Sequence, residues 1–181
     1  MQKIMFNDKY GLTTAVLQGR KTMTRRLVGN RMTEDDIAAY LKGYKDVAYN
    51  LAPYKIGEVV AVAQPYRDAF KGDWIKMQLH NDEVGFTNKM FVCAHLMPHQ
   101  IRILDIKVER LQDISDEDCL KEGLIKKTGE FIPEHFYTYY GADMDYAYVK
   151  TAFADLIDKV SGKGTWERNP YVFACSFENI N

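Results

Sequence analysis

A short basic run, residues 19–26, carries the most reactive combination of side chains in the sequence, GRKTMTRR. Four cationic side chains and two threonine hydroxyls fall within these eight positions. Cations and hydroxyls in a turn suit a phosphate group or a polarised carbonyl. The run is therefore the first candidate for a binding or catalytic site.

Lys21 stands out in this run because two arginines follow it closely. Arg25 and Arg26 would hold an anion or pair with a carboxylate, and their positive potential would lower the pKa of Lys21. A lysine that is partly neutral can act as a base toward a nearby hydroxyl. A solvated basic turn is the alternative, and these residues alone leave both interpretations open.

The elements that would position this run are short. Residues 3–6 are expected to form a first strand, and residues 8–18 a helix that ends at Gly19, so the basic run would be the loop that follows the helix. Residues 115–122 are expected to form another short helix, capped at its start and stopped by Gly123.

The rest of the chain is expected to mix strands and helices. Strands are expected over residues 57–63, 74–79, 85–94, 101–111 and 171–177, and an amphipathic helix over residues 145–160. In the longest strand Ile101 and Ile103 share one face, whereas Leu104, Ile106 and Val108 share the other. A bulge, which bends a strand and suits a closed barrel, would explain this switch. The fold class is therefore α+β, with a small β-barrel and flanking helices.

The composition limits the classes of function. The chain has 181 residues, enough for one domain, residues 1–181, with a sizeable core. Its net charge of -1 argues against a protein that coats long duplex DNA, so a local cluster must meet any anionic partner. Three widely spaced cysteines predict reduced thiols, and no stretch has the pattern of a signal peptide or a membrane span. The protein is expected in the cytoplasm, without a cofactor, and its oligomeric state is left open.

The segment from Gly11 to Arg26 resembles the opening signature of ASCH domains, the activating-signal-cointegrator homology family, in which a helix precedes Gly-(Arg/Lys)-Lys-Thr-x-Thr-x-Arg. Similar stretches follow in the order of the family at residues 57–62, at 106–111 leading into 113–123, and at 169–173. The resemblance implies a PUA-like β-barrel with a cleft for RNA or nucleotides, in a form similar to those of bacterial prophages. Compared with small members, the chain has an insertion at about 31–53 and an elaboration at about 124–165.

One bacterial branch of the family, which this chain distantly resembles, is an amidohydrolase of N4-acetylcytidine. The resemblance places its catalytic set at Lys21 and Thr24 of the run and at Glu122 of the short helix. In that scheme Lys21 takes the proton of Thr24, whose oxygen attacks the acetyl carbonyl. Arg26 and loop amides would stabilise the oxyanion, and Glu122 would orient Lys21 or pass a proton to the leaving amine. Arg25 departs from the branch, which is expected to have an apolar residue there.

The position of Glu122 has a physical argument of its own. A carboxylate in the last turn of a helix opposes the helix dipole by roughly 0.3–1 kcal/mol. A residue placed against local preference is a candidate for another task. Simple pairing with a lysine or an arginine is the alternative.

Seven residues are candidates for ligand contacts. They are Arg20, Thr22, Arg25 and Arg26 in the basic run, Gln64 and Tyr66 after the strand at 57–63, and Arg168 in the turn before the last strand. A solvated barrel rim is the alternative for the last three. A zinc site at Cys93, His95 and His99 is not expected, because their spacing matches no recognised pattern.

Three functions stay open from the sequence. The first is an ASCH domain that binds single-stranded RNA or a modified nucleoside or nucleotide in a cleft beside residues 19–26. The second is an amidohydrolase that uses Lys21, Thr24 and Glu122. The third is a protein-interaction module whose basic run holds a carboxylate.

Overall fold

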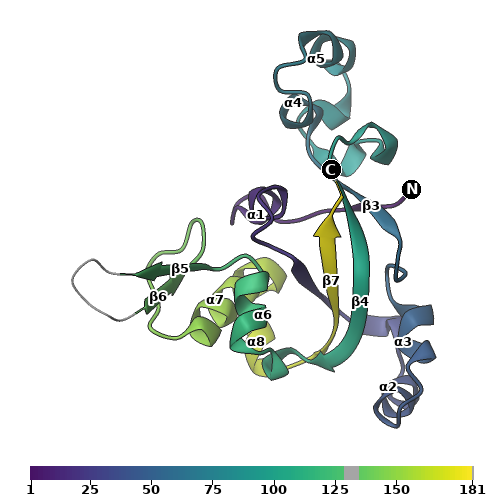
Figure 1. Cartoon of the computed structure of the whole chain (residues 1–181), viewed down its shortest axis with the longest axis vertical. Coiled ribbons are helices and arrows are strands. Elements are labelled where there is room, and N and C mark those ends of the chain that lie inside the picture. The colour runs from purple at the N-terminus through teal and green to yellow at the C-terminus, as the bar shows by residue number, and fades with distance from the viewer. Residues whose placement is uncertain (129–134, 181) are drawn as a thin grey trace.

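Two long antiparallel strands, β4 and β7, form the centre of the computed structural model, which describes residues 1–128 and 135–180 (Figure 1). In sequence order the strands of the sheet are β1 (Lys3–Ile4), β2 (Met23–Leu27), β3 (Val59–Val62), β4 (Gln100–Arg110) and β7 (Tyr171–Asn179). β3 pairs with β4 and β2 pairs with β7, both antiparallel, whereas β1 pairs with β3 in parallel. The order across the sheet is therefore β1-β3-β4-β7-β2, in a mixed α+β fold.

The long strand β4 contains the bulge that the sequence predicts. Ile103 lies opposite Phe177 and Asp105 lies opposite Ser176, so Leu104 is the extra residue. The insertion returns the apolar residues that follow it to the buried face of the strand, while Leu104 itself is exposed. The change of apolar phase in the sequence is thus explained by one inserted residue.

The edge strands β1 and β2 do not pair with each other. Among the described residues no backbone pairing joins them, so the closed barrel predicted from the sequence is not confirmed. One side-chain hydrogen bond spans the gap: Arg26 Nη2 on β2 donates to the carbonyl of Met5, just after β1, at 2.7 Å. The two edges are linked through a side chain and not through a shared ladder.

Helices and a separate two-stranded hairpin surround this sheet (Figure 1). The α-helices are α1 (Leu12–Leu17), α2 (Glu34–Leu41), α3 (Asp46–Leu51), α4 (Tyr66–Ala69), α5 (Trp74–His80), α6 (Asp116–Lys121), α7 (Val149–Ser161) and α8 (Thr165–Arg168). The hairpin is β5 (Ile125–Thr128) with β6 (His135–Thr138), and single 3-10 turns lie at Gly29–Arg31, Val84–Phe86, Lys89–Phe91, Ala94–Leu96 and Leu111–Asp113.

The helices predicted near residues 115–122 and 145–160 are confirmed as α6 and α7. The Ser115 side chain accepts a hydrogen bond from the Asp118 amide at 3.1 Å and so starts α6. α7 buries one face against the main core, with Val149, Ala152, Phe153, Leu156 and Ile157 at helical spacing. The amphipathic pattern of the sequence therefore describes a helix that covers the core.

The strands predicted at residues 74–79 and 85–94 were wrong. The first segment is the helix α5, and the second contains only 3-10 turns. The Asp73 carboxylate accepts a hydrogen bond from the Lys76 amide at 3.1 Å, which fixes the start of α5. Most large apolar side chains of α5 are exposed, so their spacing does not report a strand with one buried face.

The N-terminal elements are shorter than predicted, and the basic run is not entirely a loop. β1 ends at Ile4, and α1 begins at Leu12 because residues 8–11 form a turn that ends at Gly11 with φ 64°. Residues 23–27 pair with β7 as β2. Only residues 19–22 therefore remain as a loop, and the strand fixes the side-chain directions of the rest.

A smaller apolar cluster lies beside the main core. It consists of Ala61, Ala63, Tyr66, Phe70, Val92 and Met97. Two lysines connect this region to the N-terminal segment: Lys3 Nζ donates to the Met90 and Val92 carbonyls at 2.7 and 2.8 Å, and Lys89 Nζ lies 2.7 Å from the Asp8 carboxylate. Lys89 also donates to the carbonyl of Phe6.

The two segments that lengthen the chain fold differently. Residues 31–53 contain α2 and α3, and α2 starts with a capping box between Thr33 and Asp36. The segment at 124–165 contains the two-stranded hairpin and α7, and its residues 129–134 lie outside the described residues. Within the described parts of the chain, no helix has the length and apolar character needed to cross a membrane.

Candidate functional site

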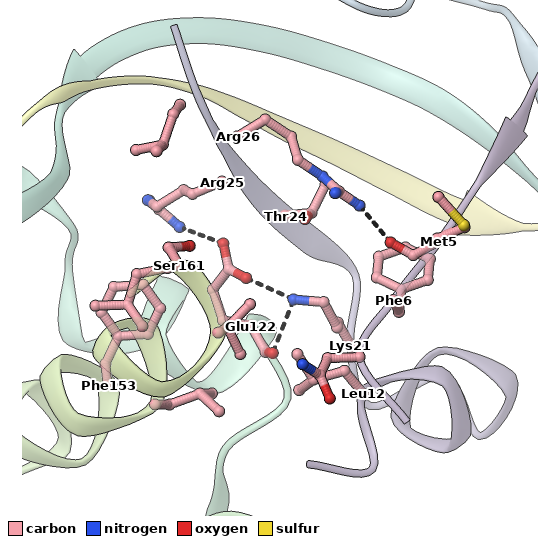
Figure 2. A pocket seen from close by; sticks show the side chains of 15 residues that line it. Met5, Phe6, Leu12, Lys21, Thr24, Arg25, Arg26, Glu122, Phe153 and Ser161 are labelled. Carbon is pink, nitrogen blue, oxygen red and sulfur yellow. Dashed lines mark hydrogen bonds and ion pairs between the residues drawn. The ribbon is translucent and has the colours of Figure 1, made fainter. Parts of the chain in front are cut away.

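A pocket of about 260 Å³ opens beside β2 (Figure 2). One wall is polar and comes from the basic run and the end of α6, with Lys21, Thr24, Arg25, Arg26 and Glu122. The facing wall comes from α7, with Phe153, Leu156, Ile157, Val160 and Ser161. Met5, Phe6 and Asn7 close the pocket on the side of β1, and Leu12 of α1 completes it. The pocket thus lies where the two edges of the sheet approach each other.

The pairing of β2 explains why there is space beside this strand. The carbonyl of Thr22 accepts from the Phe177 amide at 2.9 Å, and the Val28 amide donates to the Tyr171 carbonyl at 3.0 Å. Even-numbered positions therefore direct their backbone groups toward β7, and odd-numbered positions direct theirs to the free edge. Because no described strand occupies that edge, side chains and not backbone form this side of the pocket.

Lys21 lies at the base of the polar wall and is 2% exposed. Its Nζ lies 2.5 Å from Glu122 Oε2 and 2.8 Å from the Glu122 carbonyl oxygen. Burial lowers the pKa of Lys21 below its ordinary value of 10.5; Glu122 opposes this effect, and Arg26 and Arg25 add to it. The amine is therefore easier to deprotonate than that of an exposed lysine.

Glu122 caps the C-terminus of α6 and is held from two sides. Its Oε2 faces Lys21, and its Oε1 accepts from Arg25 Nη1 at 3.1 Å (Figure 2). Gly123, with φ 103°, turns the chain immediately after it and lies against the stem of Lys21. The end of α6 thus brings a carboxylate to a lysine that lies about one hundred residues earlier in the chain.

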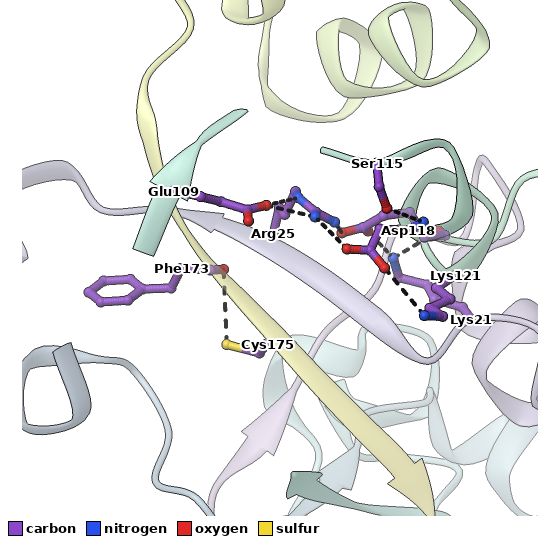
Figure 3. Close-up of polar contacts among 9 residues, drawn as sticks. Lys21, Arg25, Glu109, Ser115, Asp118, Lys121, Phe173 and Cys175 are labelled. Atoms are coloured by element: carbon purple, nitrogen blue, oxygen red, sulfur yellow. Dashed lines mark hydrogen bonds and ion pairs between the residues drawn. The ribbon is translucent and has the colours of Figure 1, made fainter. Parts of the chain in front are cut away.

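Arg25 lies behind Glu122, and its guanidinium donates hydrogen bonds to carboxylates of the protein (Figure 3). Its Nε and Nη2 donate to Glu109 Oε1 at 3.0 and 2.7 Å, and Nη2 lies 3.4 Å from Asp118 Oδ2. Burial opposes the charge of Arg25, but Glu122 and Glu109 outweigh it and raise the pKa of the guanidinium. Arg25 therefore remains charged, and its charge is already matched within the protein.

Thr24 and Arg26 leave polar groups unused in the pocket. Thr24 is buried, and among the described residues its hydroxyl makes no hydrogen bond. Arg26 Nη2 is bonded to Met5, whereas its buried Nε has no partner in the described part of the chain. The pocket is therefore lined by one unbonded hydroxyl and one buried amine, and an unpartnered Arg26 Nε is buried in its wall.

Five predicted ligand contacts lie elsewhere. Arg20 is exposed and donates to Gln18 and to the Gly123 carbonyl, and the Thr22 amide donates to the Lys121 carbonyl. Tyr66 stacks on Phe70 in the smaller cluster. Gln64 is buried, and its backbone N–H donates to Met97 Sδ. Arg168 donates to the Thr165 hydroxyl and to the Lys163 carbonyl. None of these five described side chains lines the pocket.

The apolar wall of the pocket was not predictable from the sequence. The helical spacing in residues 145–160 correctly indicated a buried face. That spacing is the same whether a residue packs in the core or lines a cavity. Met5 and Phe6 were assigned only to a strand. Pocket residues on these elements carry no signal that separates them from packing residues.

The described residues contain no group of three or more His, Cys, Asp or Glu side chains placed to hold a metal ion, at Cys93, His95 and His99 or elsewhere. No protein-family model, curated protein or solved structure matches the chain. The chemistry of the site therefore has to be argued from its own geometry.

The charges around the pocket are balanced. Lys21 and Arg25 pair with Glu109, Asp118 and Glu122. Arg26 adds a third positive charge and is bonded to the Met5 carbonyl. A balanced, buried cluster attracts polyanions weakly but can move a proton between defined atoms. The site is thus better suited to a small, largely neutral ligand than to a long phosphate backbone.

Proposed function

We propose that the protein is an amidohydrolase of the ASCH kind that removes an acyl group from the exocyclic nitrogen of a nucleoside such as N4-acetylcytidine. The observation that carries the proposal is the shared pocket of Lys21 and Thr24. A buried amine with a lowered pKa and an unbonded hydroxyl line the same small cavity, and Glu122 holds the amine in place.

The proposed reaction has two steps. Neutral Lys21 Nζ accepts the proton of Thr24 Oγ1 as that oxygen bonds to the acyl carbon, and the protonated amine then returns the proton to the leaving nitrogen as the C–N bond breaks. Water next attacks the Thr24 ester and gives a proton to Lys21, which passes it to Thr24 Oγ1 as the ester bond breaks. The carboxylic acid is released, and free Thr24 and neutral Lys21 are restored. Glu122 keeps Lys21 oriented. Arg26, which lines the pocket, supplies positive charge for the developing oxyanion.

The size and shape of the pocket support a nucleoside more than an RNA strand. Pockets for small ligands span roughly 300–1,000 Å³, and this one, at about 260 Å³, lies just below that range. The apolar wall of α7, which includes Phe153, suits the flat face of a base (Figure 2). As part of the proposal, the five-stranded sheet is a PUA-like barrel that stays open between β1 and β2.

Binding of single-stranded RNA is the second candidate, and one feature favours it. Arg20 and the exposed ring of Tyr140 line a hollow of about 290 Å³ on the outer side of Gly11. A cation and an aromatic ring suit a phosphate and a stacked base. The balanced charges around Lys21 give this candidate less support than the enzyme.

The enzyme is tested by incubation with N4-acetylcytidine and chromatography of the cytidine released. Thr24→Ala and Lys21→Met are expected to lower kcat/KM by about 1,000-fold or more, because each removes a reacting group. Thr22→Ala is the matched control, since this neighbouring hydroxyl does not line the pocket, and it should retain activity. Absence of cytidine release by the wild type, or full activity of Thr24→Ala, would overturn the proposal.

The two candidates also differ in their response to salt. Nucleoside binding in a neutral pocket should change little with ionic strength, whereas phosphate contacts give a log–log slope of about -0.7 per contact on single-stranded RNA. Titration of both ligands over a salt series distinguishes them. The second candidate, binding of single-stranded RNA, would be favoured if the protein bound RNA tightly, if that binding weakened steeply with salt, and if Arg20→Ala abolished it.

A further inference from the structure

The carboxylate of Glu122 is divided between two cations. One oxygen, Oε2, lies 2.5 Å from Lys21 Nζ, and the other, Oε1, lies 3.1 Å from Arg25 Nη1. All three side chains are buried. Figure 2 shows Lys21 and Arg25 approaching the carboxylate from opposite sides. Each oxygen thus has a fixed partner, and the plane of the carboxylate is set by both.

Arg25 can hold its place because two further carboxylates hold it. Glu109 on β4 accepts from Nε and Nη2, and Asp118 on α6 lies 3.4 Å from Nη2 (Figure 3). The side chain of Arg25 has no exposed surface. A guanidinium is planar and presents several donors in a fixed fork, so it can bridge three carboxylates where an ammonium cannot. The register of β2 on β7 places Arg25 on the same side of the sheet as Glu109.

Among the described residues, the charged groups that face Lys21 come from two elements. β2 contributes Arg25 and Arg26, and the end of α6 contributes Glu122. The residues that α7 and α1 present to the pocket are uncharged. Glu109 and Asp118 act on Lys21 from behind Arg25, and Lys121 pairs with Asp118 on the exposed side. Beyond the effect of burial, the balance of charge at Lys21 therefore depends on how much of the charge of Glu122 is shared with Arg25.

We propose that Arg25 is a positioning residue for the reaction proposed above: it holds one oxygen of Glu122 so that the other oxygen orients Lys21 toward Thr24. The inference rests on the proposed function and adds a residue to it. Arg25 touches no ligand in this role, because within the described residues its side-chain hydrogen bonds all go to carboxylates of the protein. It acts through Glu122 on the proton affinity and direction of the amine.

The proposal predicts opposite effects from the two ends of the network. Without Arg25, the full charge of Glu122 acts on Lys21 and keeps it protonated to higher pH. Without the charge of Glu109, less of the positive charge of Arg25 is neutralised, so Arg25 attracts Glu122 more strongly. Less of the charge of Glu122 then acts on Lys21, which loses its proton at a lower pH. General damage to the fold would not move the pH profile in two directions.

The experiment measures kcat/KM against pH for the wild type, Arg25→Met, Glu109→Gln and Arg25→Lys. Activity needs neutral Lys21, so the midpoint of its rise with pH should move up by about one pH unit or more in Arg25→Met, and down in Glu109→Gln. Arg25→Lys keeps the charge but cannot bridge Glu109 and Glu122, so kcat should fall about tenfold or more with a smaller shift. Arg102→Met, on the exposed pair with Glu178, is the matched control and should behave as wild type.

Unshifted midpoints in active Arg25→Met and Glu109→Gln, or wild-type rates in Arg25→Lys, would overturn the positioning role. A second measurement does not depend on activity. NMR titration of isotope-labelled lysine, assigned with Lys21→Met, follows the protonation of Lys21 directly and should show the same opposite shifts. If the wild type releases no cytidine while these shifts occur, the proposed reaction is wrong and the Arg25 network stands. If cytidine is released and neither shift occurs, the proposed reaction stands and the positioning role of Arg25 is wrong.

Discussion

Lys21 is the residue whose burial most affects how the protein responds to pH. Its pKa is lower in the folded chain than the ordinary 10.5, chiefly because of burial. The unfolded chain therefore binds a proton that the folded chain has lost, in the range between the folded pKa and about 10.5. Stability from this group rises with pH across that range and is constant above it.

This sign gives a test by comparison with Lys21→Met. The free energy of unfolding of the wild type, relative to the variant, should increase as pH rises toward about 10.5 and then level off. Urea unfolding of both proteins at a series of alkaline pH values measures the difference, in which other titrating groups largely cancel. A difference independent of pH would mean that Lys21 is ordinary in the folded protein.

The cysteines provide another residue-scale prediction. Burial raises the pKa of Cys119 and of Cys175 to about 12, whereas Cys93 is exposed. At about pH 8 only Cys93 should react with iodoacetamide, because the thiolate is the nucleophile. Mass spectrometry should find one adduct on the native protein and three after unfolding. A second adduct on the native protein would show that one of the buried thiols is accessible.

At the scale of elements, the turn after α6 sets the site. Gly123 and Gly162 have nearly the same φ, 103° and 102°. An added Cβ would meet nothing within 4 Å at Gly162, but at Gly123 it would lie 3.3 Å from Ala15 Cβ and 3.4 Å from Lys21 Cβ. The two glycines are thus matched in φ and differ in their neighbours.

Alanine substitution separates these two effects. Gly123→Ala and Gly162→Ala should each lower the free energy of unfolding by about 1–3 kcal/mol, because both place a side chain at positive φ. Only Gly123→Ala should also slow acyl-nucleoside hydrolysis, since it pushes on Lys21. Chemical denaturation and kcat of both variants provide the measurement. Equal loss of activity in the two would contradict a specific role for the turn.

The sequence predicted elements where the local pattern has one physical cause. The switch of phase at Leu104 required a bulge, and the face of α7 required a helix against the core. The strand prediction for α5 was wrong because the tryptophan and isoleucine at its start favour strands by propensity. Both side chains are exposed, so no buried face supports a strand, and the Asp73 cap fixes the start of a helix. β2 was missed because its Arg25 is buried with carboxylates from distant segments and its Arg26 bonds the Met5 carbonyl, and no local pattern shows either partner.

The candidate site was predictable only in part for the same reason. Lys21 and Thr24 belong to one motif, and the place of Glu122 at a helix end indicated a special role. The partners of Arg25 lie 84 to 97 positions away, and no local pattern joins them to it. The wall from α7 lies further still along the chain. Side chains that meet across the sheet are fixed by its register, which the sequence does not display.

At the scale of the whole molecule, the smaller cluster is the least anchored region. Residues 66–97 contain short helices with exposed apolar side chains and depend on Lys3 and Lys89 for their connection to the N-terminal segment. Hydrogen exchange should be faster there than in β4 and β7, and Lys89→Met should increase it further without changing β4 or β7. Mass spectrometry of peptic fragments measures this. Equal protection throughout would show that both clusters open together.

The pairing of β2 with β7 has a consequence for synthesis. Lys21 and Thr24 leave the ribosome about 150 residues before the strand that holds their segment. Until Tyr171–Asn179 has emerged, β2 lacks the neighbour on which its register depends. The nascent chain therefore carries its reactive residues unassembled over this whole interval, and the site is completed only when β7 joins the sheet.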